Sequence, residues 1–318
     1  MVSKVYLNND VRGWNQNIFW HIQELGGIAQ ISSNIDEVLD MEGGAMYFNL
    51  HHNPARLRSD LYFVDRVHYF RATIMIVPTL YECLLYNNKI KQYKSYPQYF
   101  PASRQLSSKY EAYNALSDFE FPFISKPNNR AGGASVKIIN NKKDAQQVIN
   151  AAFPGSDSLC LTDEESLVWQ EYMPNNDCDY RVVVLANRYF WVAKRPAGDR
   201  GLVCGTSVKK YGAECYDELN DDIIEVMEYI YGFSNKYHFT RLAADVIFDK
   251  NHNPIMTEFS ACWGTNMMRK GVFFYRKDSG EYVKADFGGI DQFKLMAKLL
   301  LDEEFQDVAC KQLVARNV

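Results

Sequence analysis

The chain has 318 residues, of which 47% are hydrophobic and 23% charged, a balance typical of a soluble globular protein with a sizeable core. The formal net charge is -4, so the composition gives no basic surface that would bind nucleic acid by charge alone. The longest apolar runs, such as Ala72–Val77, are far too short to cross a bilayer. We therefore expect neither nucleic acid nor a membrane among the partners.

The first ten residues lack the charged-then-apolar pattern of a secretion signal. The seven cysteines are odd in number and form no C-x-x-C pair, which is typical of reduced thiols. Both features predict a cytoplasmic protein. Cys262 is the best candidate for a nucleophile, but a packing role is the favoured interpretation.

The first 86 residues alternate short strands and helices. Strands are predicted at Lys4–Leu7, Met46–Leu50 and Ala72–Val77, and helices at Asn15–Leu25, Leu57–Val67 and Thr79–Tyr86. This alternation predicts a small three-layer α/β unit with a parallel sheet. Nothing in these residues indicates its function.

From Lys89 onward the pattern becomes that of an α+β unit. Its predicted helices are a short one from Lys89 through Tyr93, then Ser107–Leu116 and Lys143–Phe153, and its strands are Phe123–Lys126, Val136–Ile139 and Leu167–Tyr172. Two hairpins follow, with arms Tyr180–Ala186 and Tyr189–Lys194, then Leu242–Asp249 and Pro254–Phe259. Helices are predicted at Asp221–Tyr237 and Gly289–Leu301.

The loop Pro127–Ala134 contains adjacent glycines just after Lys126. Adjacent glycines let backbone N–H groups converge on an anion, and a lysine beside them adds a point charge for a phosphate. An ordinary glycine turn between two strands is the alternative. No Gly-Lys-Ser/Thr follows, so the loop is not a Walker A loop.

The second hairpin carries two carboxylates, Asp245 and Glu258, one on each arm. The short turn brings the arms side by side, and an unpaired carboxylate inside the apolar run around Asp245 is costly. Two converging carboxylates suit Mg²⁺, which prefers oxygen ligands. A structural salt bridge is the alternative for either residue.

Together with the apolar strand that ends in Trp169–Met173, these segments resemble, in order and spacing, the ATP-grasp superfamily over about residues 89–269. Within it they most resemble the branch of glutathione synthetase and the protein-modifying glutamate ligases. The resemblance implies an α/β (α+β ATP-grasp) fold with the nucleotide between two lobes. It divides the chain into a pre-ATP-grasp domain (residues 1–86), a small lobe with the glycine loop (87–173) and a C-terminal lobe with the magnesium site (174–318).

The resemblance assigns the nucleotide to the small lobe and its hinge. The lysine that opens the family domain in an Asp-Lys pair matches Lys89, preceded here by Asn88, and the lysine of the Pro-x-x-x-Lys-Pro strand matches Lys126. The remaining nucleotide contacts implied are the glycine loop (Gly132, Gly133, Ala134 and Ser135), the adenine hinge (Gln170, Glu171 and Met173) and Asp177 at the ribose.

The C-terminal lobe matches the family's catalytic and substrate motifs. Its Asp-x-Arg motif followed by a valine-rich strand falls on Asp179-Tyr180-Arg181, and the next arm ends in Arg195, then Gly-Asp and Arg200. The resemblance implies that Arg195 and Arg200 act in transfer. Arg181, Asn266 and Arg269 are the substrate-binding candidates, with a solvated surface position as the alternative for Arg269.

The magnesium motif matches Asp245, Glu258 and Ser260. The usual pattern is Glu-x-Asn, and Ser260 stands in the asparagine position. A serine oxygen coordinates weakly, so the number of magnesium ions stays open, and Asn266 is near enough in sequence to substitute.

The resemblance implies an ATP-dependent ligase that phosphorylates a carboxylate and forms a C–N bond when an amine attacks the acylphosphate. ATP and Mg²⁺ are the implied cofactors, an amino acid or peptide carboxylate and an amine acceptor are the implied substrates, and a homodimer is left open. Two alternatives use the same nucleotide site: a small-molecule kinase, and a non-catalytic ATP-binding module like the synapsins. The products separate them, because a ligase releases ADP only when acid and amine are both present.

Overall fold

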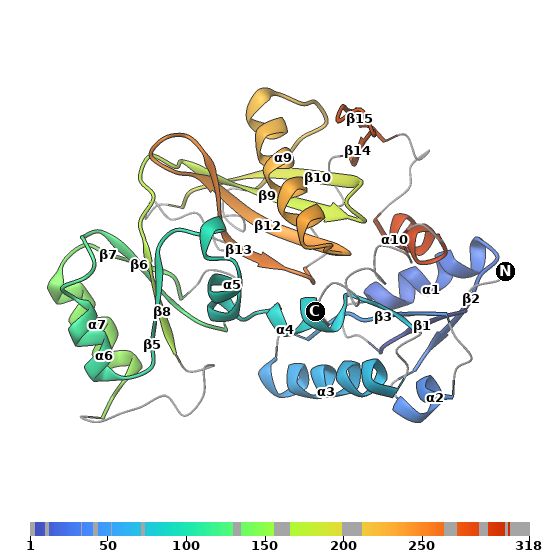
Figure 1. Ribbon diagram of the computed structural model, residues 1–318, viewed down its shortest axis with the longest axis horizontal. Coiled ribbons are helices and arrows are strands. Elements are labelled where there is room, and N and C mark those ends of the chain that lie inside the picture. The colour runs from blue at the N-terminus through green and yellow to red at the C-terminus, as the bar shows by residue number, and fades with distance from the viewer. Residues whose placement is uncertain are drawn as a thin grey trace.

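The computed structural model describes residues 4–9, 13–32, 34–40, 44–51, 53–70, 74–129, 135–155, 166–198, 212–263, 272–285, 292–302 and 305. In these residues three sheets lie side by side along the long axis of the molecule (Figure 1). The division predicted after residues 86 and 173 falls between the sheets, and we keep it as a proposal for the domain boundaries.

The N-terminal unit is built on a parallel sheet with strand order β2-β1-β3-β4. Its elements are β1 (Lys4–Leu7), α1 (Trp14–Glu24), β2 (Ile28–Ile31), α2 (Ile35–Leu39), β3 (Ala45–Tyr47), α3 (Pro54–Phe70), β4 (Met75–Val77) and α4 (Leu80–Leu85). Alternate residues point to opposite faces, so Leu7 and Tyr47 pack with α1 while Tyr6 and Met46 pack with α3. The predicted three-layer unit with a parallel sheet is confirmed.

One strand prediction in this unit needs correction, and one strand was missed. The strand predicted at Met46–Leu50 ends at Tyr47, because beyond it the Asn8 side chain binds the backbone of Asn49, donating to its carbonyl at 3.1 Å and accepting from its N–H at 2.8 Å. The strand β2 was missed, since its four residues are partly exposed and lack a clear alternation.

The middle sheet is antiparallel, with strand order β5-β8-β6-β7. Its elements are α5 (Lys89–Ser95), a 3₁₀ turn (Pro97–Tyr99), β5 (Ser103–Leu106), α6 (Lys109–Ala115), β6 (Phe123–Pro127), β7 (Lys137–Ile139), α7 (Lys142–Ala152) and β8 (Leu167–Glu171). Helices α6 and α7 cover one face and enclose a core around Phe123 and Trp169. The polar strand β5 was not predicted from the sequence.

The largest sheet has the order β13-β12-β9-β10-β14-β15, with β11 pairing to β10. Its elements are β9 (Cys178–Leu185), β10 (Tyr189–Pro196), β11 (Glu214–Cys215), α9 (Asp221–Lys236), β12 (Arg241–Phe248), β13 (Pro254–Ser260), β14 (Phe274–Arg276), β15 (Tyr282–Lys284) and α10 (Gln292–Leu300). One face, with Val182 and Val184, packs on α9. The opposite face, with Val183 and Leu185, packs on α1 and α10.

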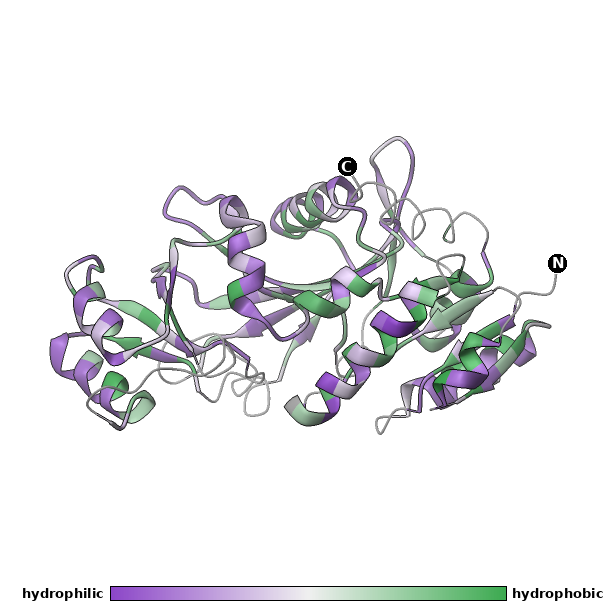
Figure 2. Ribbon diagram, turned by 60° about the horizontal axis from the view of Figure 1, so that its bottom comes forward, coloured by the Kyte–Doolittle hydropathy of each residue, from purple (hydrophilic) through white to green (hydrophobic). Residues whose placement is uncertain are grey.

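Hydropathy follows these layers. In Figure 2 the strands are largely green, while the covering helices are banded in green and purple, as amphipathic surface helices are. No helix in the described residues is long and apolar enough to cross a membrane.

Candidate active site

One face of the largest sheet gathers four charged side chains from neighbouring strands. Asp179 and Arg181 of β9 lie on this face because they are two residues apart. In the strand register Asp179 faces Arg195 of β10, and Arg181 faces Asp245 of β12. The Asp-x-Arg motif thus places a carboxylate opposite an arginine on one neighbouring strand and an arginine opposite a carboxylate on the other.

These four side chains form one ionic network. Arg195 donates from Nε to Oδ1 of Asp179 at 2.6 Å and from Nη2 to Oδ2, and its Nη2 also lies 2.8 Å from Oδ1 of Asp245. Arg181 donates from Nη2 to Oδ2 of Asp245 at 2.9 Å, and its Nε contacts Oδ1 as an ion pair without hydrogen-bond geometry. Because two acids meet two bases, the network carries no net charge when all four groups are ionised.

Burial and charge shift the pKa values of this network in opposite directions. Burial raises the pKa of Asp179 to about 6 even though Arg195 lowers it. For Asp245, burial raises the pKa, but Arg181 and Arg195 together hold it below its usual value. Burial lowers the pKa of Arg195, but the two carboxylates raise it above its usual value. The site therefore keeps Arg195 charged and Asp245 ionised.

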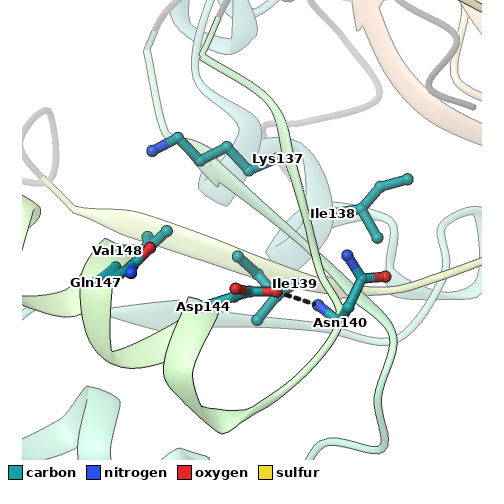
Figure 3. A pocket seen from close by; sticks show the side chains of 7 residues that line it. All are labelled: Lys137, Ile138, Ile139, Asn140, Asp144, Gln147 and Val148. Carbon is teal, nitrogen blue, oxygen red and sulfur yellow. Dashed lines mark hydrogen bonds between the residues drawn. The ribbon is translucent and has the colours of Figure 1, made fainter. Parts of the chain in front are cut away.

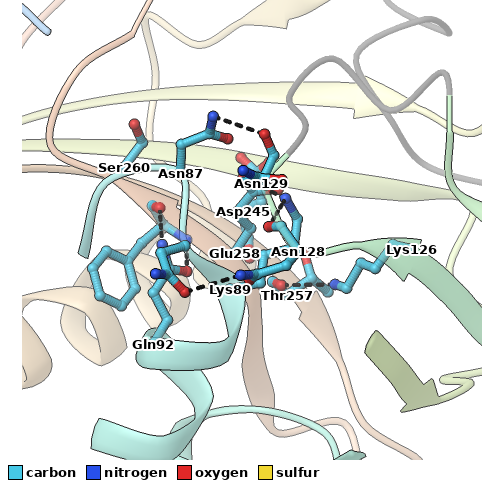
Figure 4. Close-up of polar contacts among 12 residues, drawn as sticks. Asn87, Lys89, Gln92, Lys126, Asn128, Asn129, Asp245, Thr257, Glu258 and Ser260 are labelled. Atoms are coloured by element: carbon cyan, nitrogen blue, oxygen red, sulfur yellow. Dashed lines mark hydrogen bonds and ion pairs between the residues drawn. The ribbon is translucent and has the colours of Figure 1, made fainter. Parts of the chain in front are cut away.

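Two buried lysines approach this region from the preceding part of the chain (Figure 4). Lys89, in α5, donates from Nζ to the carbonyl of Asn128 at 3.2 Å and forms an ion pair with Glu258 at 3.4 Å. Lys126, in β6, donates from Nζ to Oε1 of Gln170 at 2.9 Å and to the carbonyl of Thr257 at 3.1 Å. Lys126 thus connects the middle sheet to β13 of the largest sheet.

The environment of Lys126 disfavours its charge. Burial, together with the nearby Lys89, lowers its pKa to about 7, although Glu258 and Asp245 oppose the shift. Its hydrogen-bond acceptors are a neutral amide and a carbonyl, and its Nζ lies 5.3 Å from the ring centroid of Tyr93. A bound anion would favour the charged form of this lysine.

Asparagine and glutamine side chains fix the helix that carries Lys89. Asn88, at the position of the family's aspartate, caps α5 by accepting from the N–H of Lys91 at 3.1 Å. Gln92 clamps α5 onto β13, donating to the carbonyl of Phe259 at 2.8 Å and accepting from its N–H at 3.1 Å. Asparagine at position 88, in place of the aspartate expected from the resemblance, therefore still caps the start of the helix.

The predicted metal ligands come together in part. Asp245 and Glu258 are opposite each other in the register of β12 and β13, next to a bulge after Asp245. Oxygen donors on adjacent strands fit Mg²⁺, and the Glu258 side chain is 29% exposed, so it is open to a ligand. Ser260 is different: its hydroxyl donates to the carbonyl of Cys262 and accepts from its N–H at 3.3 Å, which holds it in a local turn.

The hinge residues lie where β8 leaves the sheet. Gln170 is buried between Ser103 and Ile124, while Glu171 is exposed and Met173 is half-buried in the turn that follows. Asp177 is exposed, and its carbonyl accepts from the N–H of Ala197 beside the end of β10. Contacts of these residues with a nucleotide stay a prediction.

Of the remaining predicted site residues, the structure describes Ser135 alone. Ser135 is half-buried in the turn before β7. The others lie outside the described residues: Gly132, Gly133, Ala134, Arg200, Asn266 and Arg269.

Sequence reasoning missed Thr257 and Gln92. Thr257 contributes its backbone carbonyl, which accepts from Lys126 and also from the Tyr93 hydroxyl at 2.9 Å. Gln92 lies three residues after Lys89, so a helix places the two on one face, and this spacing is the sequence signal that could have found it. A backbone acceptor leaves no such signal in the sequence.

A depression of about 440 Å³ lies elsewhere, on β7 and the start of α7 (Figure 3). It is lined by Lys137, Ile138, Ile139, Asn140, Asp144, Gln147 and Val148. Oδ2 of Asp144 accepts from the N–H of Asn140 at 3.3 Å, so the acidic group there stabilises the turn. None of the residues assigned to the site lines this depression.

The chain matches no protein-family model and no curated protein sequence. Its structure does match solved structures over nearly the whole length. A D-alanine–D-alanine ligase from Bacillus anthracis superposes with a TM-score of 0.60 at 14% identity, covering 98% of this chain and 99% of that one. The D-cycloserine synthetase DcsG superposes with a TM-score of 0.59 at 11% identity, covering 98% and 100%, and the ATP-grasp ligase PsnB with 0.57 at 13%, covering 96% and 97%.

The chain has the ATP-grasp fold. The fold predicted from the sequence is confirmed across the N-terminal unit as well as the two lobes, because the matches extend beyond residues 89–269. At 11–14% identity these likenesses concern the fold. On the geometry described above, the region between Lys126 and Glu258 is the candidate active site.

Proposed function

We propose that this protein is an ATP-dependent carboxylate–amine ligase that requires magnesium. The observation that carries the proposal lies where the small lobe contacts β13: Lys89 pairs with the Glu258 carboxylate, and Lys126 donates to the carbonyl of the neighbouring Thr257. Two buried cations from separate elements, with neutral acceptors around one of them, suit a polyanion such as the nucleotide phosphates.

Named ligases with the same fold support this proposal. PsnB was solved with its precursor peptide and AMPPNP, and again with magnesium and ADP. The Bacillus anthracis D-alanine–D-alanine ligase was solved with ATP. By that likeness we propose ATP and Mg²⁺ for this chain, with an amino acid or a peptide among the substrates.

The residues divide the work of such a reaction. Lys89 and Lys126 would hold the phosphates, and Asp245 and Glu258 would hold Mg²⁺, which neutralises charge on phosphate oxygens. ATP would phosphorylate the substrate carboxylate, and an amine would then displace phosphate from the acylphosphate. Fixed cations placed where negative charge develops lower the barrier.

Arg195 is our candidate for the residue that stabilises the charge of transfer. In this arrangement it is 3% exposed and engages Asp179 and Asp245. Asp245 would also be a ligand of Mg²⁺, whereas Asp179 binds Arg195 by two hydrogen bonds and would orient it. Asp179 is then a positioning residue for Arg195.

The experiment that tests this function follows ADP release from Mg-ATP with pools of amino acids and small peptides. A ligase releases ADP and phosphate when acid and amine are present together and little with either alone. ADP release that needs one acceptor and yields no free phosphate identifies a kinase. If Mg-ATP raises the melting temperature but no pool releases ADP, a binding module replaces the proposed ligase.

A further inference from the structure

Arg241 is a buried cation on the face of β12 that carries Asp245. Residues 241, 243 and 245 alternate onto this face, so Arg241 and Asp245 are about 13 Å apart along the strand, at roughly 3.3 Å per residue. The Arg241 end of the face is covered by the N-terminal unit and α10, in a core that includes Trp14 and Trp263. Arg241 therefore lies between the candidate active site and the N-terminal unit.

Aromatic rings from three chain segments surround the guanidinium. Its Cζ lies 4.3 Å from the ring centroid of Trp263, 5.1 Å from that of Tyr47 and 5.3 Å from that of Trp14. Nη1 donates to the Tyr47 hydroxyl, and the whole residue is 0% exposed. In the described residues, Nε and Nη2 have no hydrogen-bond partner.

The buried acid Glu82 attracts this charge through space, but its carboxylate is engaged by other donors. Glu82 uses its carboxylate to accept from the N–H of Thr79 at 2.6 Å and from the N–H and hydroxyl of Thr240 at 2.5 and 2.6 Å. It reaches Arg241 through the backbone N–H at 3.3 Å. Among the described residues, the Arg241 side chain forms no ion pair with a carboxylate, and an arginine in a protein cannot lose its proton.

The edge of the guanidinium formed by Nε and Nη2 binds a carboxylate in three other arginines of the described chain. Arg195 holds Asp179 by Nε and Nη2, Arg181 holds Asp245, and Arg276 holds Glu228 at 3.1 and 3.4 Å. This edge matches the two oxygens of a carboxylate, and a buried charge without such a partner is costly. Arg241 has the same Nε and Nη2 edge, and within the described ranges no carboxylate occupies it.

We propose that Arg241 anchors an unreacted carboxylate of one of the two substrates, which makes it a specificity-determining residue. The inference rests on the proposed ligase, whose activated carboxylate would sit at the Asp245 end of the same face. The second carboxylate belongs either to an amino acid that serves as the amine or to a dicarboxylic acid substrate. Because the guanidinium is fully covered, the rings of Trp14 and Trp263 must repack when the carboxylate enters.

The experiment measures tryptophan fluorescence of the full-length protein with Mg-AMPPNP. The probes are the proteinogenic amino acids and short dicarboxylates such as succinate, each compared with its carboxamide. At least one free carboxylate should bind about 30-fold or more tightly than its amide, the range for removing one partner of a buried charge pair. A response to amino acids with one carboxylate assigns Arg241 to the amine, and a response restricted to dicarboxylates assigns it to the acid.

Arg241→Met should abolish the difference between carboxylate and amide and leave AMPPNP affinity unchanged. Arg276→Met is the matched control, because it removes the same edge at Glu228 and should keep the discrimination. If Arg241→Met does not fold, Arg241→Lys keeps the charge and should show weakened discrimination. Failure of both to fold would assign the guanidinium to folding and overturn the proposal.

A wild-type protein that binds no carboxylate more tightly than its amide also overturns the proposal, as does discrimination that survives in Arg241→Met. These outcomes are separate from the proposed function, because binding needs no turnover. If Arg241 discriminates carboxylates but no pair of substrates releases ADP, the carboxylate-binding role of Arg241 is supported and the proposed ligase activity is contradicted. ADP release without discrimination between carboxylate and amide supports the ligase and contradicts the proposed role of Arg241.

Discussion

Two buried arginines on one face of the largest sheet have opposite environments. Arg195, at the active-site end, is held by the carboxylates of Asp179 and Asp245. Arg241, at the end under the N-terminal unit, is surrounded by rings and has no carboxylate on its Nε and Nη2 in the described part of the chain. Carboxylates of the protein pair with the first cation, whereas the guanidinium of the second forms no ion pair within the described ranges, where we propose a substrate carboxylate.

Lys126 is the intermediate case. It is buried like the two arginines, but its acceptors are neutral, so burial with Lys89 lowers its pKa to about 7. A lysine can respond to burial by losing its proton, and an arginine cannot. The comparison teaches that an unbalanced buried cation in this fold points to a ligand, and most strongly when it is an arginine.

Replacing each arginine by methionine tests the comparison most directly. Arg195→Met leaves Asp179 and Asp245 buried with less compensation, so the free energy of unfolding should fall by about 3–5 kcal/mol. Arg241→Met removes an unbalanced charge and keeps an apolar side chain among the rings, so ligand-free stability should stay equal or rise. Urea unfolding of the two variants measures both values. A large loss in Arg241→Met would mean that the rings alone stabilise its charge.

Glu258→Gln tests whether the reaction takes place at the end of the sheet face that carries Arg195 and Asp245. Glutamine keeps an acceptor for Lys89 but removes the charge that holds Mg²⁺, so ADP release should fall about 100-fold or more while the melting temperature changes little. Glu281→Gln is the control, because Glu281 forms an exposed ion pair with Lys277 in the turn between β14 and β15. Normal turnover in a stable Glu258→Gln would place the reaction elsewhere.

The sequence predicted the fold well because the ATP-grasp motifs are local. Lys126 precedes the glycine loop, and Asp245 and Glu258 stand on two arms of one hairpin, so the chain order already brings them together. Contacts between distant segments were not predictable. Arg241 meets Trp14 and Tyr47 only after the N-terminal unit packs on β12, and Thr257 contributes a carbonyl that every residue possesses.

The strands gave the same lesson on a smaller scale. Apolar alternation predicted β9, β10, β12 and β13 to within a few residues. The polar strand β5 was missed, because its place in the sheet depends on pairing with β8 rather than on its own side chains.

The smallest expected effect is the uptake of a proton by Lys126 when nucleotide binds. The folded, ligand-free protein has Lys126 with a pKa of about 7, against an ordinary value of 10.5. In that window the unfolded chain holds the proton that the folded chain releases, so this group makes the free energy of unfolding rise with pH. Nucleotide phosphates favour the charged lysine, so at about pH 8.5 binding of Mg-AMPPNP should take up close to one proton, and far less at about pH 6.

Calorimetry in buffers of different ionisation enthalpy counts this proton. Lys126→Ala should lose the uptake and bind nucleotide more weakly, whereas Lys94→Ala, which removes an exposed lysine bonded to Gln105, should keep both. Equal proton uptake in wild type and Lys126→Ala would mean that Lys126 does not face the phosphates. Lys126 would then be a neutral structural group, and Arg241 would be the clearest buried cation that awaits an anion.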